Sequence, residues 1–512
     1  MGSMGAMGAM GAARTMRRSR GPVAVCAAAA LAGLTGHAGS VRAEARPPYG
    51  GSVEGSLLGA PVALDPVDAQ SHAEVTVVGL VFDTLYAIGA DGTAQPHLAL
   101  GPPVLDAPRT TAHIALRRGV AFHDQATMTA SDVADSLERA RTRLPWLLAP
   151  VAAVRAAGDG IDLVLRAPDV DVAPLLALPQ TAITRRGQAP AAARPVGTGP
   201  FLVDSFDPAA RHLTLRAFDD HFAGRPYLDR IGLSWFDAPD AEVRRFETGA
   251  AQLSARGQTA FAGARPKFPA QAIESPAAVL VFVGFGRRHP TAAVVNEPAF
   301  RRALDLALDR GAIAAITAGE RTLPTRLPLP PEAGAPLAPL ASAGDPARAL
   351  EVLRASRAAA LAPAALARLR LSILVDETRP DDKEIALRVA RGLDRLGIGY
   401  AIEAVGAAVL RDRVQSRDCD LWVGQLAAPL GIAAAWWGAA FAAGNDDWPR
   451  RSLMQGGVDP AAASAEFARK LPIVPLMFRS LLMWVQKDVH GLAFDASARP
   501  GLADLYWFKA RP

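Results

Sequence analysis

Two histidines, His113 and His123, are the first candidates for chemistry in this 512-residue chain. They flank the start of a stretch rich in arginine, aspartate and hydroxyl residues, Leu116 to Ala140. A bound metal ion needs several His, Cys or carboxylate ligands at a suitable spacing. Neither histidine has a carboxylate at such a spacing, so we expect ordinary polar positions here and no metal site.

Motifs for covalent or cofactor chemistry are also missing from the sequence. There is no GxSxG elbow, no HExxH and no SxxK with its partner motifs. Gly284 and Gly286 form a fragment of a dinucleotide fingerprint, but His289 occupies the third glycine position. The glycines of Val196 to Phe201 are followed by neither a lysine nor a helix start, which argues against a phosphate loop. We therefore expect no enzyme and no cofactor.

The first 43 residues have the pattern of a secretory signal peptide. Basic residues, among them Arg17, Arg18 and Arg20, precede the short apolar run Val23 to Leu34. Small residues then lead to an expected cleavage site after Ala43. Met16 is an alternative start. The pattern predicts export and a periplasmic location.

Cleavage there changes the charge of the chain. Residues 1–43 hold five arginines and no acids, so the formal net charge falls from +5 to zero. No basic patch with interleaved aromatic residues remains, and we expect no nucleic acid partner. Cys419 is then the sole cysteine, which excludes an intramolecular disulfide.

Hydrophobic periodicity indicates a mixed α/β protein that would position these residues. Thr111 to Arg117 alternates as a half-buried strand, and Thr129 with Asp132 forms a capping-box-like helix start. The apolar run Ala277 to Phe285 predicts a strand buried on both faces. A helix from Glu297-Pro298 is expected to continue to about Asp309-Arg310. A second α/β succession between Leu371 and Val423 favours a two-lobed molecule.

Six motifs occur in an order and spacing that resemble one family. It is the family 5 extracytoplasmic solute-binding proteins, the peptide, oligopeptide and nickel binders of ABC importers. The motifs cover nearly the whole chain after residue 43; they are LDP (64–66), LVFDTLYAIGADGTAQPHLA (80–99), LRRGVAFHD with TASDV (116–133), VGTGPF (196–201), FRRALDLALDRGAI (300–313), and IVPLMF with KDVHGL (473–492).

The resemblance implies a two-lobed periplasmic-binding-protein fold of the large kind, cluster C or type II. An extra domain is inserted in the N-terminal lobe, lobe I, which is therefore built from three separate stretches of chain. The implied order is a signal peptide (1–43), the first stretch of lobe I (44–86), the inserted domain (87–195), the second stretch of lobe I (196–278), lobe II (279–484) and the last stretch of lobe I (485–512).

The resemblance also implies a function in import. The protein would capture a small ligand, peptide-like or another organic solute, between its lobes and deliver it to ABC permease subunits in the inner membrane. It would need no cofactor, because the transporter's cytoplasmic subunits hydrolyse ATP, and we expect a monomer. Two alternatives stay open: a degenerate binding protein acting as a sensor, chaperone or partner-binding subunit, and, less favoured, a hydrolase.

Two departures from the family pattern concern the ligand. Gly286-Arg287 follows Phe285 where many members have an asparagine. Peptide binders carry an acid that pairs with the ligand's ammonium after the strand at Asp420 to Gly424, yet residues 424–441 contain no carboxylate. A buried ammonium without a counter-charge is costly. The resemblance therefore implies that a ligand with a free peptide N-terminus binds here only if another acid takes the place of the missing one.

The candidate ligand-binding residues come from an early loop and from these two departures. Arg287 could pair with an acidic ligand group, and the aromatic side chains could form a wall for a flat or apolar ligand. The alternatives are a turn role for Asp65, a solvated or structurally paired Arg287, and core positions for the aromatic residues. The full set is Asp65, Phe285, Gly286, Arg287, Trp422, Gln425, Trp436, Trp437 and Phe441.

Overall fold

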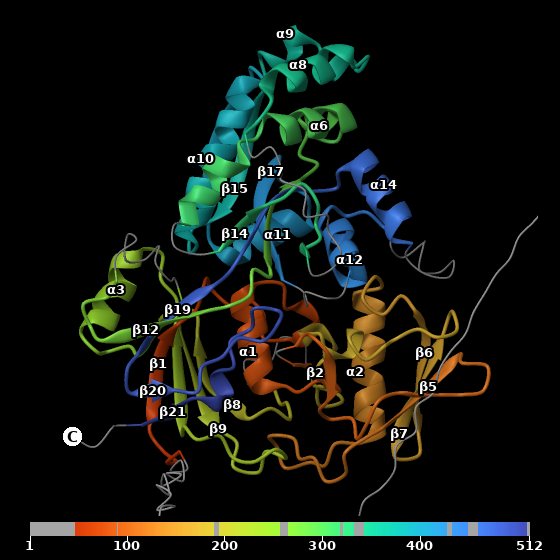
Figure 1. Ribbon diagram of the computed structural model, residues 1–512, viewed down its shortest axis with the longest axis vertical. Coiled ribbons are helices and arrows are strands. Elements are labelled where there is room, and N and C mark those ends of the chain that lie inside the picture. Colours follow the sequence, from red (N-terminus) through yellow and green to blue (C-terminus); the bar gives the residue numbers. More distant parts are fainter. Residues whose placement is uncertain are drawn as a thin grey trace, which may run out of the picture. The chain divides into compact units, whose positions relative to one another are not determined.

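The structure is a computed structural model that describes residues 47–89, 91–188, 194–255, 265–317, 321–331, 343–427, 433–448 and 459–508. The expected signal peptide and its cleavage site lie outside the described residues. Residues Pro47–Pro512 belong to one compact unit. We call its six-stranded sheet with the covering helices lobe II, and its two four-stranded sheets with their helices lobe I (Figure 1).

One four-stranded sheet of lobe I begins the described chain. Its strand order is β1 (Ser52–Ser56), β10 (Arg230–Ser234), β9 (His212–Ala217) and β8 (Phe201–Asp207). The apolar side chains of this sheet pack with those of α1 (His72–Val81) in one buried core. Ser71 and Glu74 form a capping box that fixes the start of α1. Helix α3 (Pro239–Glu247) follows the sheet in sequence.

The second four-stranded sheet contains the strand expected at Thr111. Its order is β4 (Val104–Leu105), β5 (Thr111–Ala115), β7 (Gly160–Leu165) and β6 (Val151–Ala157). Helix α2 (Ala130–Arg143) packs on it, and its capping box between Thr129 and Asp132 confirms the predicted helix start. The ribbon of β2 (Tyr86–Ile88) and β3 (Ala94–Pro96) adds to the same core. The domain boundaries stay predictions.

Lobe II is built on the six-stranded sheet. Its order is β14 (Thr322–Pro324), β18 (Val474–Arg479), β13 (Val279–Phe285), β17 (Leu421–Ala427), β15 (Arg370–Asp376) and β16 (Gly399–Val405). The helices that accompany it are α5 (Ala292–Val295), α6 (Pro298–Ala307), α7 (Arg310–Ala314), α8 (Pro346–Ala355), α9 (Pro363–Leu366), α10 (Pro380–Arg395), α11 (Ala407–Gln415), α12 (Ala433–Ala443) and α14 (Pro460–Lys470).

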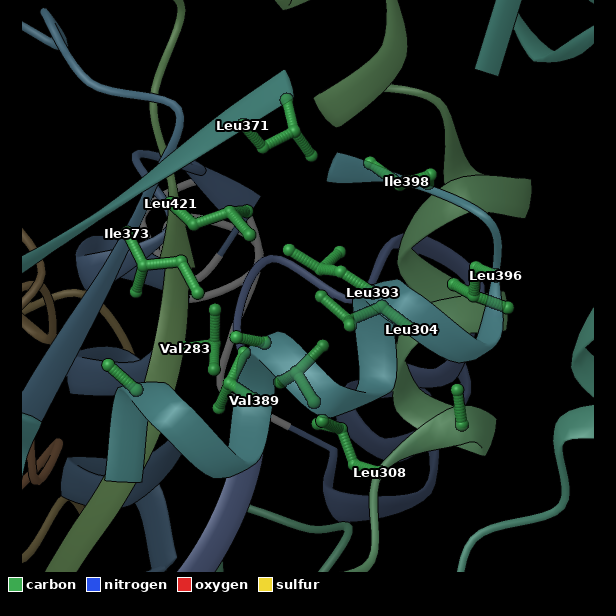
Figure 2. Packing of buried hydrophobic residues seen from close by; sticks show 14 of the residues in the cluster. Val283, Leu304, Leu308, Leu371, Ile373, Val389, Leu393, Leu396, Ile398 and Leu421 are labelled. Carbon is green, nitrogen blue, oxygen red and sulfur yellow. The ribbon is translucent and has the colours of Figure 1, made fainter. Parts of the chain in front are cut away.

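Strand β13 is buried on both faces, as the apolar run predicts. Val281 and Val283 pack into the core formed with α6 and α10, where Val283, Leu304 and Leu393 lie close together (Figure 2). Leu280 and Phe282 pack into a separate core that includes α12 and α14. A central strand with a layer on each face cannot alternate apolar and polar residues, which explains the continuous run.

The sequence expectation for the helix after Pro298 is wrong at its end. Helix α6 stops at Ala307, and Asp309 begins a new helix, α7. The Asp309 carboxylate accepts a hydrogen bond from the Ala312 amide at 2.9 Å. This cap satisfies a free amide of the first turn and favours a fresh helix start over continuation.

Two adjacent chain segments connect the lobes. Strands β12 (Ala270–Glu274) and β19 (Leu482–Gln486) pair antiparallel, and each continues directly into a paired strand of lobe II, β13 or β18 (Figure 1). Between these pairs Ser275 and Leu481 exchange two hydrogen bonds of 2.8 Å. Strand β19 also pairs with β11 (Leu253–Ser254), and the chain ends with the pair β20 (Val489–His490) and β21 (Tyr506–Trp507).

Candidate functional site

Asp65, in the early loop, has two structural partners. Its carboxylate accepts from the Val67 amide at 3.1 Å and from Arg139 at 2.6 Å. The residue is buried and lines a small cavity of about 80 Å³. These contacts agree with the expected turn geometry, and a ligand contact by Asp65 stays a prediction.

Phe285, Gly286 and Arg287 lie at the end of β13. A Cβ atom on Gly286 would approach the Cys419 carbonyl oxygen to 1.8 Å, so only glycine allows this close backbone contact. The glycine at this position therefore has a structural reason. Arg287 is exposed, and with Phe285 it lines a cavity of about 410 Å³.

The aromatic candidates on α12 lie in the core of lobe II. Trp436, Trp437 and Phe441 are each at most 1% exposed. Trp437 packs against Phe467, and Trp436 meets Phe478 edge-on at 5.1 Å between ring centroids. The structure brings these three side chains together as packing residues, and an aromatic wall facing a ligand stays a prediction.

The remaining candidates, Trp422 and Gln425, are on β17. Trp422 contacts Phe282 edge-on at 5.0 Å, and its ring covers Gly284. Gln425 donates a hydrogen bond to Asp382 at the start of α10, at 3.0 Å. Gln425 thus contacts a charged group that the sequence did not single out.

That group belongs to a set of seven charged residues where lobe I meets lobe II, which we call the charged junction. It comprises Glu74, Asp376, Arg379, Asp381, Asp382, Arg411 and Arg479. When all are ionised, four carboxylates face three guanidinium groups. Within this set one negative charge is in excess.

Glu74 is the lobe I member of the charged junction. Its fully buried carboxylate accepts bonds from the amides of the loop before α1 and from Arg411 of α11, across 337 residues of sequence. A second contact between the lobes runs from the Ala60 amide to the Thr378 hydroxyl at 3.3 Å. The junction therefore joins the two lobes directly.

Arg379 and Asp382 form the interior of the junction. The Arg379 Nε atom lies 3.0 Å from one Asp382 oxygen and 3.2 Å from Asp376. Burial raises the pKa of Asp382 to about 6; Arg379 opposes the shift, whereas the negative charges of Asp376 and Asp381 add to it. The raised pKa means that the surroundings of Asp382 disfavour its ionised form.

The sequence carried only a weak signal for the junction. Asp381 and Asp382 follow Pro380 at the start of a predicted helix, where acids are common for helix-dipole reasons. Their partners Gln425 and Arg479 are 43 and 98 residues away. A local pattern cannot reveal such pairings.

Replacing Asp382 by asparagine is expected to flatten the pH dependence of stability in the mildly acidic range. The pKa of Asp382 is about 6 in the folded protein and 3.8 in its ordinary state, so the folded protein binds this proton more tightly. Stability then falls as the pH rises from about 4 to about 6, by at most ~3 kcal/mol. Urea unfolding of both proteins from pH 4 to 7 checks this, and parallel profiles would contradict it.

Metal and thiol chemistry find no support within the described ranges of the chain. They contain no group of three or more His, Cys, Asp or Glu side chains arranged to hold a metal ion. Cys419 is buried, and burial raises the pKa of its thiol to about 12. A protonated, buried thiol is a poor nucleophile.

Among the same described residues, no helix has the length and apolar character needed to span a bilayer.

The fold is that of a two-lobed α/β protein. The periplasmic binding protein AgaA from A. tumefaciens R10, solved in complex with agropinic acid, has the same fold: its TM-score is 0.73 at 21% identity, with 90% of this chain and 99% of AgaA covered. Residues 93–445 match the model of the bacterial extracellular solute-binding proteins, family 5 Middle. The chain belongs to this family.

Two curated relatives match shorter stretches of the chain. An uncharacterized protein, YhjP of Bacillus subtilis strain 168, is 30% identical over 39% of this chain and 34% of its own length. The glutathione-binding protein GsiB of Salmonella choleraesuis is 26% identical over 57% of this chain and 58% of its own length. The chain thus matches between about a third and three fifths of these relatives.

Proposed function

We propose that this protein is the extracytoplasmic solute-binding component of an ABC importer. It captures a small organic solute between lobes I and II and delivers it to permease subunits in the inner membrane. The charged junction carries the proposal, because the buried Glu74 of lobe I and the partly buried Arg411 of lobe II form an ion pair that exists only while the lobes are together. Two paired connecting segments between the lobes suit hinge closure.

The proposal includes a role for Asp382 toward the solute. The family resemblance implies that peptide binders carry an acid after the strand that corresponds to β17, and residues 424–441 of this chain lack one. Asp382 is an acid in direct contact with Gln425 of that strand. Its pKa is raised, so an added positive charge nearby would stabilise its ionised form. A solute with an ammonium group therefore fits this site best.

Native mass spectrometry of protein purified from its own host tests the proposal. We expect a co-purifying small molecule that raises the melting temperature when it is added back to stripped protein. A thermal-shift panel that includes glutathione and agropinic acid extends the search. If no compound co-purifies and none shifts the melting temperature, solute capture is overturned.

A matched pair of variants tests the role of Asp382. Asp382→Asn is expected to weaken binding of the co-purified solute about tenfold, because a charge-assisted hydrogen bond is lost. Asp394→Asn removes an exposed acid from the same helix and is expected to leave binding unchanged. Equal affinity in both variants would remove Asp382 from the site while leaving solute capture intact.

A further inference from the structure

A cavity of about 410 Å³ lies at the end of β13 in lobe II. Three arginines, Arg287, Arg301 and Arg417, line it, and Asp446 lines it as well. The volume falls within the range of small-molecule binding pockets. Counting these four side chains, three positive charges and one negative charge leave a net charge of +2.

The three arginines have no carboxylate partner within 4.0 Å among the described residues. Asp446 is engaged elsewhere, because its oxygens accept from Lys470 at 2.7 and 2.9 Å. Arg301 and Arg417 are partly buried, and a buried arginine seldom lacks a counter-charge. The lining therefore has an unbalanced positive charge.

Arg301 is held in place by neutral groups. Its guanidinium donates to the Val295 carbonyl at 3.0 Å and to the Asn296 side-chain oxygen at 2.9 Å. Its central carbon lies 4.4 Å from the centroid of the Phe285 ring. The group is fixed before any ligand arrives, which lowers the entropic cost of binding.

Electrostatics within the lining agree with the geometry. Burial, together with the charge of Arg287, lowers the pKa of Arg301 to about 10 against the opposing effect of Asp446. Burial and Arg287 also lower the pKa of Arg417. Both guanidinium groups stay charged at neutral pH, and an anion in the cavity would relieve the repulsion that Arg287 exerts on each of them.

We propose that this cavity is a binding site for a small dianion, a compound with two carboxylates or one phosphate, held by Arg287, Arg301 and Arg417. Guanidinium groups bind both anions through paired N–H donors. The excess of positive charge in the lining suits a dianion. Phe285 and Arg301 form one wall of the site, and the side chain of Asn296 helps to hold Arg301 in place.

The arginine cavity is separate from the charged junction. Gln425, which contacts the junction, pairs with Val281 in the sheet, whereas Phe285 pairs with Leu421. Val281 and Phe285 are four residues apart on β13, which corresponds to a distance of roughly 13 Å along the strand. The dianion would thus bind lobe II alone, and the inference does not depend on solute capture between the lobes.

Isothermal titration of the full chain after residue 43 with succinate, malate and inorganic phosphate tests the proposal. Titrations at matched ionic strength with chloride serve as the salt control. We expect one saturable site for at least one of these anions. Binding of the carboxylates alone would assign the site to a dicarboxylate, and binding of phosphate alone would assign it to a phosphate compound.

Single arginine variants locate the site. Arg287→Gln and Arg417→Gln are each expected to weaken binding about tenfold or more, since each removes a charge-assisted contact. Arg391→Gln removes an exposed arginine of lobe II outside the cavity and is expected to leave affinity unchanged. Urea unfolding confirms that each variant is folded. Absence of saturable binding, or equal loss in Arg391→Gln, would overturn the proposal.

Discussion

Replacing Glu74 by alanine is expected to lower the free energy of unfolding by about 3–5 kcal/mol, because the change leaves buried partners unpaired. The carboxylate is fully buried and bonds to Arg411 of lobe II. It also accepts four backbone N–H groups, those of Val62, Ala63, Gln70 and Ser71, each at 2.9 Å. Urea unfolding with linear extrapolation measures the loss.

The Arg411→Ala variant is the matched comparison for Glu74→Ala. It removes the contact between the lobes but leaves the four amide bonds to Glu74 in place, so we expect a smaller loss of stability. The same variant is expected to weaken binding of the co-purified solute by favouring separated lobes. Equal losses of stability in both variants would show that the amide bonds contribute little.

The second large effect is expected at Asp305, the carboxylate that faces three arginines in lobe II. Asp305→Ala is expected to cost about 3–5 kcal/mol of stability, because Arg310 is left buried without its counter-charge. Arg310 is 0% exposed and donates to Asp305 at 2.6 Å. Burial lowers its pKa only to about 10, so the charge persists at neutral pH. Thermal and urea unfolding measure the loss.

Arg302 provides the control for Asp305. It also contacts the Asp305 carboxylate, at 3.3 Å, but its side chain is 50% exposed. Solvent screens such a pair, and Arg302→Ala is expected to cost no more than about 1 kcal/mol. A cost close to that of Asp305→Ala would contradict the assignment of the main effect to the buried pair with Arg310.

Local patterns in the sequence predicted much of the fold. The capping box of Thr129 and Asp132 marked the start of α2, and the uninterrupted apolar run marked β13 as a strand covered on both faces. Both signals arise from neighbours in sequence, which is why they can be read without a structure. The end of α6 was missed because a cap at Asp309 outweighed continued helical periodicity.

The site was less accessible to sequence reasoning. A tryptophan pair such as Trp436-Trp437 has the same pattern whether it lines a ligand or fills a core, and burial alone separates the two. The junction residue Asp382 acquires its partner Gln425 only because α10 packs against β17. Arg287 was singled out, yet its neighbours Arg301 and Arg417, 14 and 130 residues further along the chain, have no local pattern that links them to it.

The position of the last strands in lobe I has a consequence for how the chain folds. Strand β19 completes the sheet with β11 and β12, and residues as late as Leu502 and Leu505 fill the core around α1. Lobe I, which starts first, therefore cannot finish its core until almost the whole chain is available. Contacts across such long sequence separations slow folding. Lobe II is formed by one continuous segment from β13 to β18. We therefore expect lobe II to fold before lobe I, whose core is completed when the first and last segments of the chain pack together.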